Sequence, residues 1–542
     1  MNAVQPWGPT TQRIFDGAAL ALLATVTVVA ALTFKDYGLG WDDYTQAEYG
    51  GLLLRAYDSG FTDRRAFHFV NLYAYGGGFD MLAAWFSKLL PFDLWETRRL
   101  CGAIVGVLGL AVVWRIGRRI GGPLAGLLAL TLMAVTPLYY GHMFINPKDG
   151  PFAVAMTIAL YGTVCLFQEY PRPKPVTILI AGIGFGLAIG TRILGGFSVM
   201  YALIALALVI VAEWRMIGAH AMRHRLGIFL LALVPVVLLS YCVMALVWPW
   251  SALDPTNPVK ALLYFSEFFE APWRELFAGN LILVPEMPRH YVPQLMLLKL
   301  PEILSLLGIA GLVIACVGMT QGHQRASRRA KMLTLVLAAT VPVLVTVITR
   351  PAMYNGIRHF IFVVPALAVL GGWAGALMIQ WLKERRTIAA TLAGAAVIAA
   401  AALPVSDMIR LHPYQYISFN HAAGGIRVND PLYMLDYWGL AFKQASKRLN
   451  AWVAEHSLTP PNGRHWQIAV CGPQRPAQIE LGPNYDISWN PAGAQFVMSL
   501  GEYYCASLDA PVLVQVERDG VVFARIYDIR GKNFTSILVS GK

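Results

Sequence analysis

Residues 14–43 read IFDGAALALLATVTVVAALTFKDYGLGWDD and join a long apolar run to two adjacent carboxylates. The apolar part, residues 14–34, is long enough to cross the hydrocarbon of a bilayer as a helix. Asp42 and Asp43 follow it within a few residues. Charge near a bilayer is costly unless it lines a polar cavity, so this pair is a candidate for chemistry.

The composition of the whole chain agrees with a membrane protein. Of its 542 residues, 57% are hydrophobic and only 14% are charged, which is too apolar for an ordinary soluble globule. The net charge of +12 is explained by basic loops on the cytoplasmic side of the membrane. No patch interleaves basic with aromatic residues, so we expect no nucleic-acid partner.

Eleven apolar runs predict membrane-spanning helices. They are residues 14–34, 99–116, 122–142, 150–168, 176–191, 194–213, 226–249, 299–319, 332–349, 358–380 and 387–405. Every second loop is rich in Lys and Arg, which indicates that these loops are cytoplasmic. The N-terminus is then cytoplasmic and the C-terminus periplasmic. We favour an uncleaved first span over a cleaved signal peptide, because its apolar run is long and further spans follow.

This alternation depends on rejecting residues 69–90 as a span. Gly76, Gly77, Gly78 and Asp80 interrupt the stretch, which leaves too few apolar residues to cross a bilayer. Counting it as a span would also place the basic residues around Arg115 outside. We therefore expect a helix in the outer interface, within a first external loop of residues 35–98.

The outer face is expected to carry the chemistry. It receives residues 35–98, the turn 146–149, the loop 250–298 and everything after about residue 406, and most of the acidic residues lie there. The chain divides into a transmembrane part, residues 1–405, and a periplasmic domain, residues 406–542. Short alternating segments and a helix around 436–454 predict a small α+β fold that can form on its own.

Two cysteines lie in this C-terminal domain, at positions 471 and 505. In an oxidising periplasm Cys471 and Cys505 could pair as a disulfide, and two unpaired buried thiols are the alternative.

No motif typical of a metal or cofactor site occurs in the chain. His290 and His359 are isolated, and there is no Cys-x-x-Cys. We expect no required cofactor, although an adjacent carboxylate pair would also suit Mg²⁺ or Mn²⁺.

Several short motifs follow one another on the predicted outer face. They are Trp41-Asp42-Asp43, Arg98-Arg99, Asn146-Pro147-Lys148-Asp149, Gly190-Thr191-Arg192, Lys299-Leu300-Pro301 and Arg358-His359. In this order and placement, residues 10 to about 405 resemble the GT-C superfamily of polyprenyl-phosphate-dependent glycosyltransferases. Within it, the chain looks like the protein O-mannosyltransferase-like group, which also resembles the lipid A aminoarabinose transferases.

The resemblance implies a GT-C fold and an inverting transfer of a sugar to an acceptor hydroxyl, which needs a carboxylate base. Asp42 and Asp43 are the candidates, and we favour Asp42 slightly as the first acid of the family's motif. Alternatively, one of them only caps a following helix. The family also places an acid near the sugar site at Asp149, which could orient the acceptor or pair with a cation. A helix-start role beside Lys148 is the alternative.

The phosphate of the leaving lipid needs cations positioned beforehand. The candidates are Lys299 and Arg358, followed by Arg98, Arg99, Arg192 and His359. Each could instead reach lipid headgroups. Contacts to the sugar or acceptor are expected from Lys148, Glu286, His290 and Tyr291, although prolines alone could order the loop that holds the last three.

The acceptor stays open among a lipid, a glycan and a protein. The chain has Asp-Asp where protein O-mannosyltransferases have Asp-Glu, and no sugar-binding insertion is recognisable between the seventh and eighth spans. The sequence predicts a glycosyltransferase of the bacterial inner membrane that uses a polyprenyl-phosphate-linked sugar. The alternatives are a transporter or flippase of lipid-linked sugars, with acids near the membrane midplane, and a noncatalytic scaffold.

Overall fold

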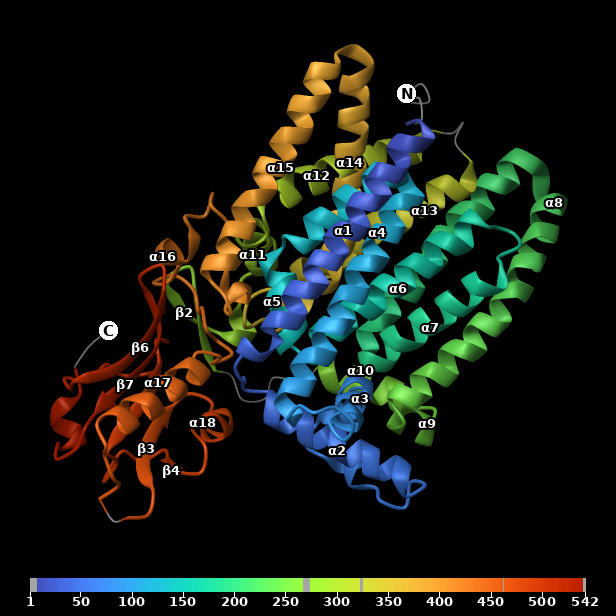
Figure 1. Ribbon diagram of the computed structural model, residues 1–542. Helices are drawn as coiled ribbons and strands as arrows, with labels where there is room; N and C mark the ends of the chain where they lie inside the picture. The colour runs from blue at the N-terminus through green and yellow to red at the C-terminus, as the bar shows by residue number, and fades with distance from the viewer. Residues whose placement is uncertain (1–6, 267–272, 322–324, 462, 540–542) are drawn as a thin grey trace.

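A bundle of long helices with a small sheet domain on one flank makes up the protein (Figure 1). The computed structural model describes residues 7–266, 273–321, 325–461 and 463–539. The predicted architecture, a polytopic helical protein with a C-terminal α+β domain, is confirmed.

Eight helical segments of the described chain are long and apolar enough to cross a membrane. They contain α1 (Pro9–Thr33), α4 (Leu94–Ala134), α6 (Asp149–Gln168), α8 (Gly196–Val247), α12 (Glu302–Thr320), α13 (Ala326–Thr349), α14 (Val364–Arg385) and α15 (Thr387–Arg410). A ninth apolar helix, α7 (Pro175–Thr191), is shorter and packs between α6 and α8.

Two of the long helices, α4 and α8, are each interrupted at a glycine. Gly122 has a backbone φ of 84° and Gly218 a φ of 81°. Residues other than glycine rarely adopt these values, because their Cβ atom clashes with the backbone. Arg225 pairs with Glu213 across the second interruption, at 3.0 Å. Counting each half separately and adding α7 gives the eleven apolar segments expected from the sequence, and the number of membrane crossings stays a prediction.

The helices that lie wholly within residues 35–98, the predicted first external loop, are all short. These are α2 (Asp43–Asp58) and α3 (Gly78–Phe86). The nine residues of α3 are about 13 Å long as a helix, far less than the thickness of a bilayer. The prediction that residues 69–90 do not form a span is therefore confirmed.

Further short elements lie between the long helices. They are α5 (Pro137–Ile145), which continues from the second half of α4, then α9 (Trp250–Leu253), α10 (Asn257–Ser266), the antiparallel hairpin β1 (Arg274–Phe277) and β2 (Asn280–Leu283), and α11 (Tyr291–Lys299). Helices α2, α3, α9 and α10 gather at one end of the bundle, and the turn between α14 and α15 lies at the opposite end (Figure 1). This separation agrees with the predicted two faces.

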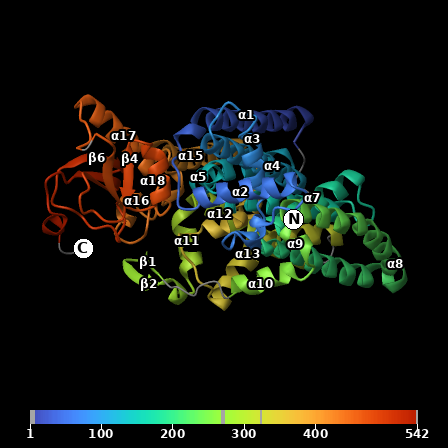
Figure 2. The same ribbon diagram turned by 90° about the horizontal axis from the view of Figure 1, so that it is seen from below.

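The C-terminal domain is built on a five-stranded sheet of order β4-β3-β5-β7-β6. Its elements are α16 (Gly425–Asn429), α17 (Phe442–Glu455), β3 (Trp466–Cys471), α18 (Gln474–Leu481), β4 (Tyr485–Ser488), β5 (Phe496–Leu500), β6 (Val512–Arg518) and β7 (Val521–Asp528). Strand β3 pairs in parallel with β4 and β5, whereas β7 pairs antiparallel with β5 and β6. From below, this domain and α8 lie on opposite flanks of the molecule (Figure 2).

The C-terminal domain and the helix bundle share one continuous apolar core. Residues 411–441 join them, and the stretches 411–420 and 433–441 of this segment are mostly buried. For example, the Asn420 side chain donates hydrogen bonds to the carbonyl oxygens of Leu297 and Leu300, at 2.6 and 2.8 Å. The expected division at residue 405 therefore separates residues that pack together, and the independent folding of residues 406–542 stays a prediction.

Candidate active site

A cavity of about 730 Å³ lies where the loops predicted to be external meet the C-terminal domain. Its size is within the range of about 300–1,000 Å³ typical of small-molecule sites. The lining residues are Trp41, Asp42, Thr45, Gln46, Asn71, Leu72, Tyr75, Lys148, Arg192, Trp273, Arg274, Tyr354, Asn355, Arg358, His359, Met434, Tyr437, Tyr503 and Tyr504. They come from segments hundreds of residues apart in the sequence.

The two adjacent carboxylates of the first external loop have different surroundings. Asp42 lines the cavity, and 39% of its side chain is exposed. It occupies the N-cap position of α2, but its side chain makes no capping hydrogen bond. Asp43 is fully buried and accepts a hydrogen bond from the backbone N–H of Gly40 at 2.8 Å. Only Asp42 is therefore open to a ligand.

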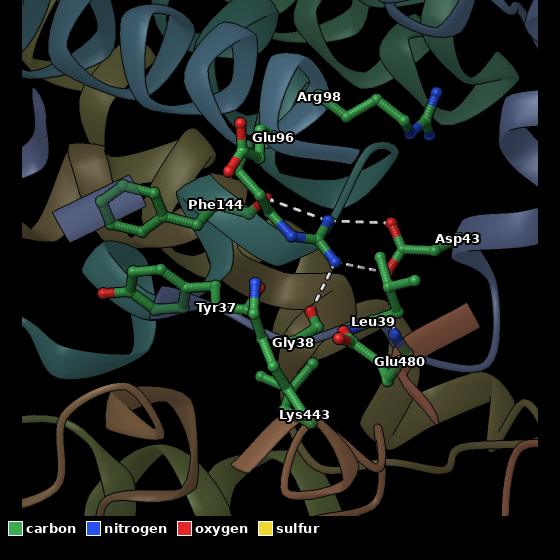
Figure 3. Close-up of polar contacts among 12 residues, drawn as sticks. Tyr37, Gly38, Leu39, Asp43, Glu96, Arg98, Phe144, Lys443 and Glu480 are labelled. Atoms are coloured by element: carbon green, nitrogen blue, oxygen red, sulfur yellow. Dashed lines mark hydrogen bonds and ion pairs between the residues drawn. The ribbon is translucent and has the colours of Figure 1, made fainter. Parts of the chain in front are cut away.

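Arg99 holds Asp43 in the interior through two parallel hydrogen bonds of 2.7 and 2.8 Å. The same guanidinium group donates to the carbonyl oxygens of Gly38 and Phe144 (Figure 3). The C-terminal domain secures this stretch from the other side, since Lys443 donates to the Tyr37 carbonyl at 3.3 Å. Arg99 thus positions the loop that carries Asp42 and does not line the cavity.

Arg98 also points away from the cavity. It pairs with Asp80 of α3 at 2.6 Å, and both side chains are buried. Burial raises the pKa of Asp80 to about 6, although Arg98 lowers it. With its amide oriented to satisfy both neighbours, Gln46 donates to Asp80 at 2.7 Å and accepts from Lys148 at 2.6 Å. This chain of contacts links the buried pair to a cation at the cavity wall.

Three cations of the cavity wall gather around Asp149 and Tyr75. Arg192 pairs with Asp149 at 2.6 Å, and Arg358 lies 3.7 Å from both Asp149 and Asp42. Lys148 stands over the Tyr75 ring, 4.6 Å from its centroid, and burial lowers the pKa of this lysine. Asp149 itself is buried outside the lining, so it orients cations rather than facing a ligand.

Arg358 and His359 each have a ring or guanidinium nitrogen without a hydrogen-bond partner among the described residues. These are the Nε atom of Arg358 and the Nδ1 atom of His359, and both are buried. The Arg358 guanidinium also lies over the ring of Trp438, 4.6 Å from its centroid. Gly40 allows this tryptophan to sit there, because a Cβ on Gly40 would meet its ring at 1.4 Å.

Lys299 is buried outside the cavity lining. Its ammonium group donates to the carbonyl oxygens of Ile417 and Ser418, at 3.3 and 3.5 Å, and lies over the Phe419 ring. These contacts come from the segment that joins the bundle to the C-terminal domain. They could not be predicted from the sequence around Lys299, because that segment is more than a hundred residues away. Its position, like those of Arg98 and Arg99, differs from the expected contact with a phosphate.

The three candidates from the loop before Lys299 do not line the cavity. Glu286 and His290 are exposed and do not line it. Tyr291 is buried and donates to Glu275 at 2.7 Å, while Glu275 also accepts from the backbone N–H of Asn355 at 2.7 Å. Tyr291 and Glu275 therefore anchor the loop that precedes Arg358.

A buried histidine connects the C-terminal segment to Asp149. His142 Nε2 lies 3.2 Å from the Tyr437 hydroxyl, and its Nδ1 lies 3.3 Å from the Asn146 amide nitrogen, which also donates to Asp149 at 2.8 Å. If Nδ1 accepts from Asn146, Nε2 carries the proton and donates to Tyr437. The hydroxyl hydrogen of Tyr437 is then free to point into the cavity.

Several lining residues were not identified from the sequence. Tyr354 belongs to a short external loop that was not counted among the outer segments, and Trp273 and Arg274 gave no motif. Tyr503 and Tyr504 come from the C-terminal domain, beside Cys505, which forms a disulfide with Cys471. Proximity to a predicted disulfide was the one signal that could have drawn attention to these tyrosines.

The carboxylates at the site do not form a donor set suited to a divalent metal. Asp43 and Asp149 each contact guanidinium groups, which leaves Asp42 as the carboxylate facing the cavity. Among the described residues, no group of three or more His, Cys, Asp or Glu side chains is arranged to hold a metal ion.

Sequence comparison identifies one related family. Residues 78–240 match the family described as dolichyl-phosphate-mannose-protein mannosyltransferase. This confirms, over that segment, the resemblance to the protein O-mannosyltransferase-like group. A search of curated proteins finds no match.

Solved structures of two other proteins have similar chain traces. ArnT from Cupriavidus metallidurans in the apo state is 14% identical, with a TM-score of 0.48 over 94% of this chain and 97% of that chain. The structure of the same protein bound to undecaprenyl phosphate has 14% sequence identity to this chain and a TM-score of 0.47, with the same coverage of both chains. The oligosaccharyltransferase of Archaeoglobus fulgidus is 12% identical, with a TM-score of 0.47 over 88% of this chain and 65% of that chain.

Proposed function

We propose that this protein is an integral-membrane glycosyltransferase that moves a sugar from a polyprenyl-phosphate donor to an acceptor hydroxyl. The observation that carries the proposal is the convergence of one exposed carboxylate with several cations in a single cavity. Asp42 faces that cavity together with Lys148, Arg192 and Arg358. The family match over residues 78–240 supports the same reaction class.

Each charged group has a role in such a transfer. The acceptor oxygen attacks the anomeric carbon from the face opposite the phosphate, the bond between that carbon and the phosphate oxygen breaks, and Asp42 takes the hydroxyl proton. The polyprenyl phosphate leaves as an anion, whose charge Lys148, Arg192 and Arg358 stabilise. Arg358, which lines the cavity, can donate charge-assisted hydrogen bonds to a phosphate oxygen.

A second cavity suits the lipid tail of the donor. It has a volume of about 370 Å³, and its lining is almost entirely apolar and comes from α6, α7 and both halves of α8. Ile189 belongs to this lining and lies three residues before Arg192, which lines the polar cavity. A polyprenyl chain held there would place its phosphate near the cations.

The cavity is proposed to open on the periplasmic side of a bacterial inner membrane. The alternation of basic loops supports this orientation, with the N-terminus cytoplasmic and the C-terminal domain periplasmic. The charged cavity lies at the ends of the spans, since α6 begins at Asp149. A transporter of lipid-linked sugars would instead place such groups near the midplane.

The proposal is tested by Asp42→Asn. This change removes the base and keeps the shape of the side chain, so we expect transfer to fall by about 10²-fold or more while the protein still inserts and unfolds at the same temperature. The measurement is mass spectrometry of envelope lipids, glycans and proteins from cells with the intact and the changed chain. Full sugar transfer by Asp42→Asn, or by Asp42→Asn with Asp43→Asn, would refute the assignment.

A further inference from the structure

The cavity has two chemically different walls. Lys148, Arg192 and Arg358, at the ends of bundle helices, form its most basic part. Trp273, Tyr437, Tyr503 and Tyr504, from the hairpin and the C-terminal domain, form a mainly aromatic part that also includes Arg274. The C-terminal domain lies on the flank opposite α8 in both views (Figures 1 and 2). A donor entering from the apolar cavity at α7 and α8 would therefore leave the aromatic wall for the acceptor.

Three of these rings are unusually open for large aromatic side chains of a folded protein, whereas Tyr437 is buried. Trp273 is 45% exposed, and Tyr503 and Tyr504 are 40% and 41% exposed. The predicted topology places the C-terminal domain outside the membrane, so lipid contact does not account for the exposure of Tyr503 and Tyr504. Open ring faces with hydroxyl groups at their edges, beside the Asn355 amide in the same lining, favour a ligand with both C–H faces and hydroxyls.

The aromatic wall is also held in place before any ligand arrives. The Tyr503 hydroxyl donates to the Arg274 carbonyl of the hairpin. Glu502 accepts from the backbone N–H of Leu435 at 3.1 Å, and the Cys471–Cys505 disulfide ties the same loop to the end of β3. A preformed wall lowers the entropy lost on binding.

We propose that this aromatic wall is the acceptor subsite and that it binds a saccharide ring, so that the acceptor hydroxyl belongs to a glycan. A sugar offers C–H faces to the electron-rich faces of the rings and hydroxyls to the tyrosine and amide groups. An acyl chain would match an almost entirely apolar lining, as in the second cavity, better than a wall edged with hydroxyls. This inference rests on the proposed function, since it names the acceptor of that reaction.

Binding is tested on the full-length protein in nanodiscs. The probes are mono- to tetrasaccharides of glucose, galactose, mannose and N-acetylglucosamine, followed by saturation-transfer NMR and titration. We expect at least one to bind, and Tyr503→Ala with Tyr504→Ala to weaken it about tenfold. Trp273→Ala, on a different element, should weaken it similarly, and Trp489→Ala, an exposed tryptophan outside the cavity, should not. No binding, or equal binding by all variants, overturns the proposal.

Transfer is tested by the chemical nature of the product. Sugar that is lost in the Asp42→Asn cells should come from a glycan, and Tyr503→Ala with Tyr504→Ala should raise the acceptor KM about tenfold with the donor KM unchanged. Sugar on a serine or threonine of a protein, or on a lipid without a glycan, would overturn the saccharide inference and leave the proposed transfer intact. Absence of any transferred sugar would refute the transferase itself, while the binding titration still decides the saccharide subsite.

Discussion

At the scale of single residues, the division of labour between Asp42 and Asp43 is the most consequential feature. Successive residues at the start of a helix point about 100° apart, so one carboxylate faces the cavity while its neighbour faces the core. Asp43 meets Arg99 there, at 2.7 Å. The sequence favours Asp42 only slightly over Asp43, because the burial of Asp43 depends on a partner 56 positions away.

Asp43→Asn should reduce stability, in contrast to Asp42→Asn. Asparagine leaves the Arg99 guanidinium buried without a counter-charge, which costs about 3–5 kcal/mol in comparable buried pairs. Thermal unfolding in detergent measures the difference. The double change Asp43→Asn with Arg99→Gln removes both charges and should be less destabilising than the sum of the two single changes. Equal unfolding temperatures for Asp42→Asn and Asp43→Asn would contradict this account.

Arg358→Ala should weaken donor binding without unfolding the protein. The guanidinium lines the cavity and lies 3.7 Å from Asp42, so a phosphate bound there would gain charge-assisted hydrogen bonds of about 1.5–3 kcal/mol, or roughly 10- to 100-fold in affinity. Titration with undecaprenyl phosphate measures the effect. Arg289→Ala is the control, because Arg289 donates to the carbonyls of Val347 and Ile348 outside the cavity. Unchanged affinity in Arg358→Ala would remove it from the phosphate site.

At the scale of elements, the short connecting segments supply more of the cavity lining than the long helices do. The hairpin β1–β2 supplies Trp273 and Arg274 at its start, and Phe277 of β1 forms a β-bridge with Tyr433 of the C-terminal segment. The loop before Arg358 is fixed by Glu275 of the same hairpin. Hydrophobic periodicity predicted the positions of the long helices. It cannot predict which loops contact one another, because these contacts join parts of the chain that are distant in sequence.

The disulfide between Cys471 and Cys505 should form and should stabilise the aromatic wall. Its ends are 34 positions apart, and closing a loop of that length is worth about 3–4 kcal/mol in the chain-entropy account. Mass spectrometry of the unreduced protein tests the bond, and two free thiols would refute it. Cys471→Ser with Cys505→Ser should lower the unfolding temperature, whereas Cys242→Ser, at an exposed free cysteine, should not.

At the scale of the whole molecule, the C-terminal domain acts as a wall of the site and not as an appendage. Its core is continuous with that of the bundle, and it contributes Met434, Tyr437, Tyr503 and Tyr504 to the cavity. Three carboxyl groups are buried near this junction. Burial raises the pKa of Asp436 to about 6, of Glu275 to about 7 and of Glu502 to about 8.

These three carboxyl groups contribute stability that is lost as the pH rises from about 4 to about 8. Their pKa values in the folded protein exceed the usual values of about 4, so the folded state retains protons that the unfolded state has lost. The stabilisation is complete below pH ~4 and is lost as the pH passes through the folded pKa values. Unfolding temperatures across this range measure it. Glu502→Gln should flatten the decline and exposed Glu455→Gln should not, and an unchanged slope in Glu502→Gln would contradict the prediction.

The sequence by itself determined that the chain is polytopic, that residues 69–90 do not span, and that an α+β domain follows the bundle. These features depend on local apolar length and periodicity, which any stretch of chain carries within itself. It also placed Asp42, Lys148, Arg192, Arg358 and His359 among the candidates that line one cavity. Only the tertiary structure separated Asp42 from Asp43, buried Lys299 under the segment after α15, and brought Tyr437, Tyr503 and Tyr504 to the site. Those outcomes depend on long-range packing, because a side chain faces a ligand or the core according to neighbours that are remote in sequence.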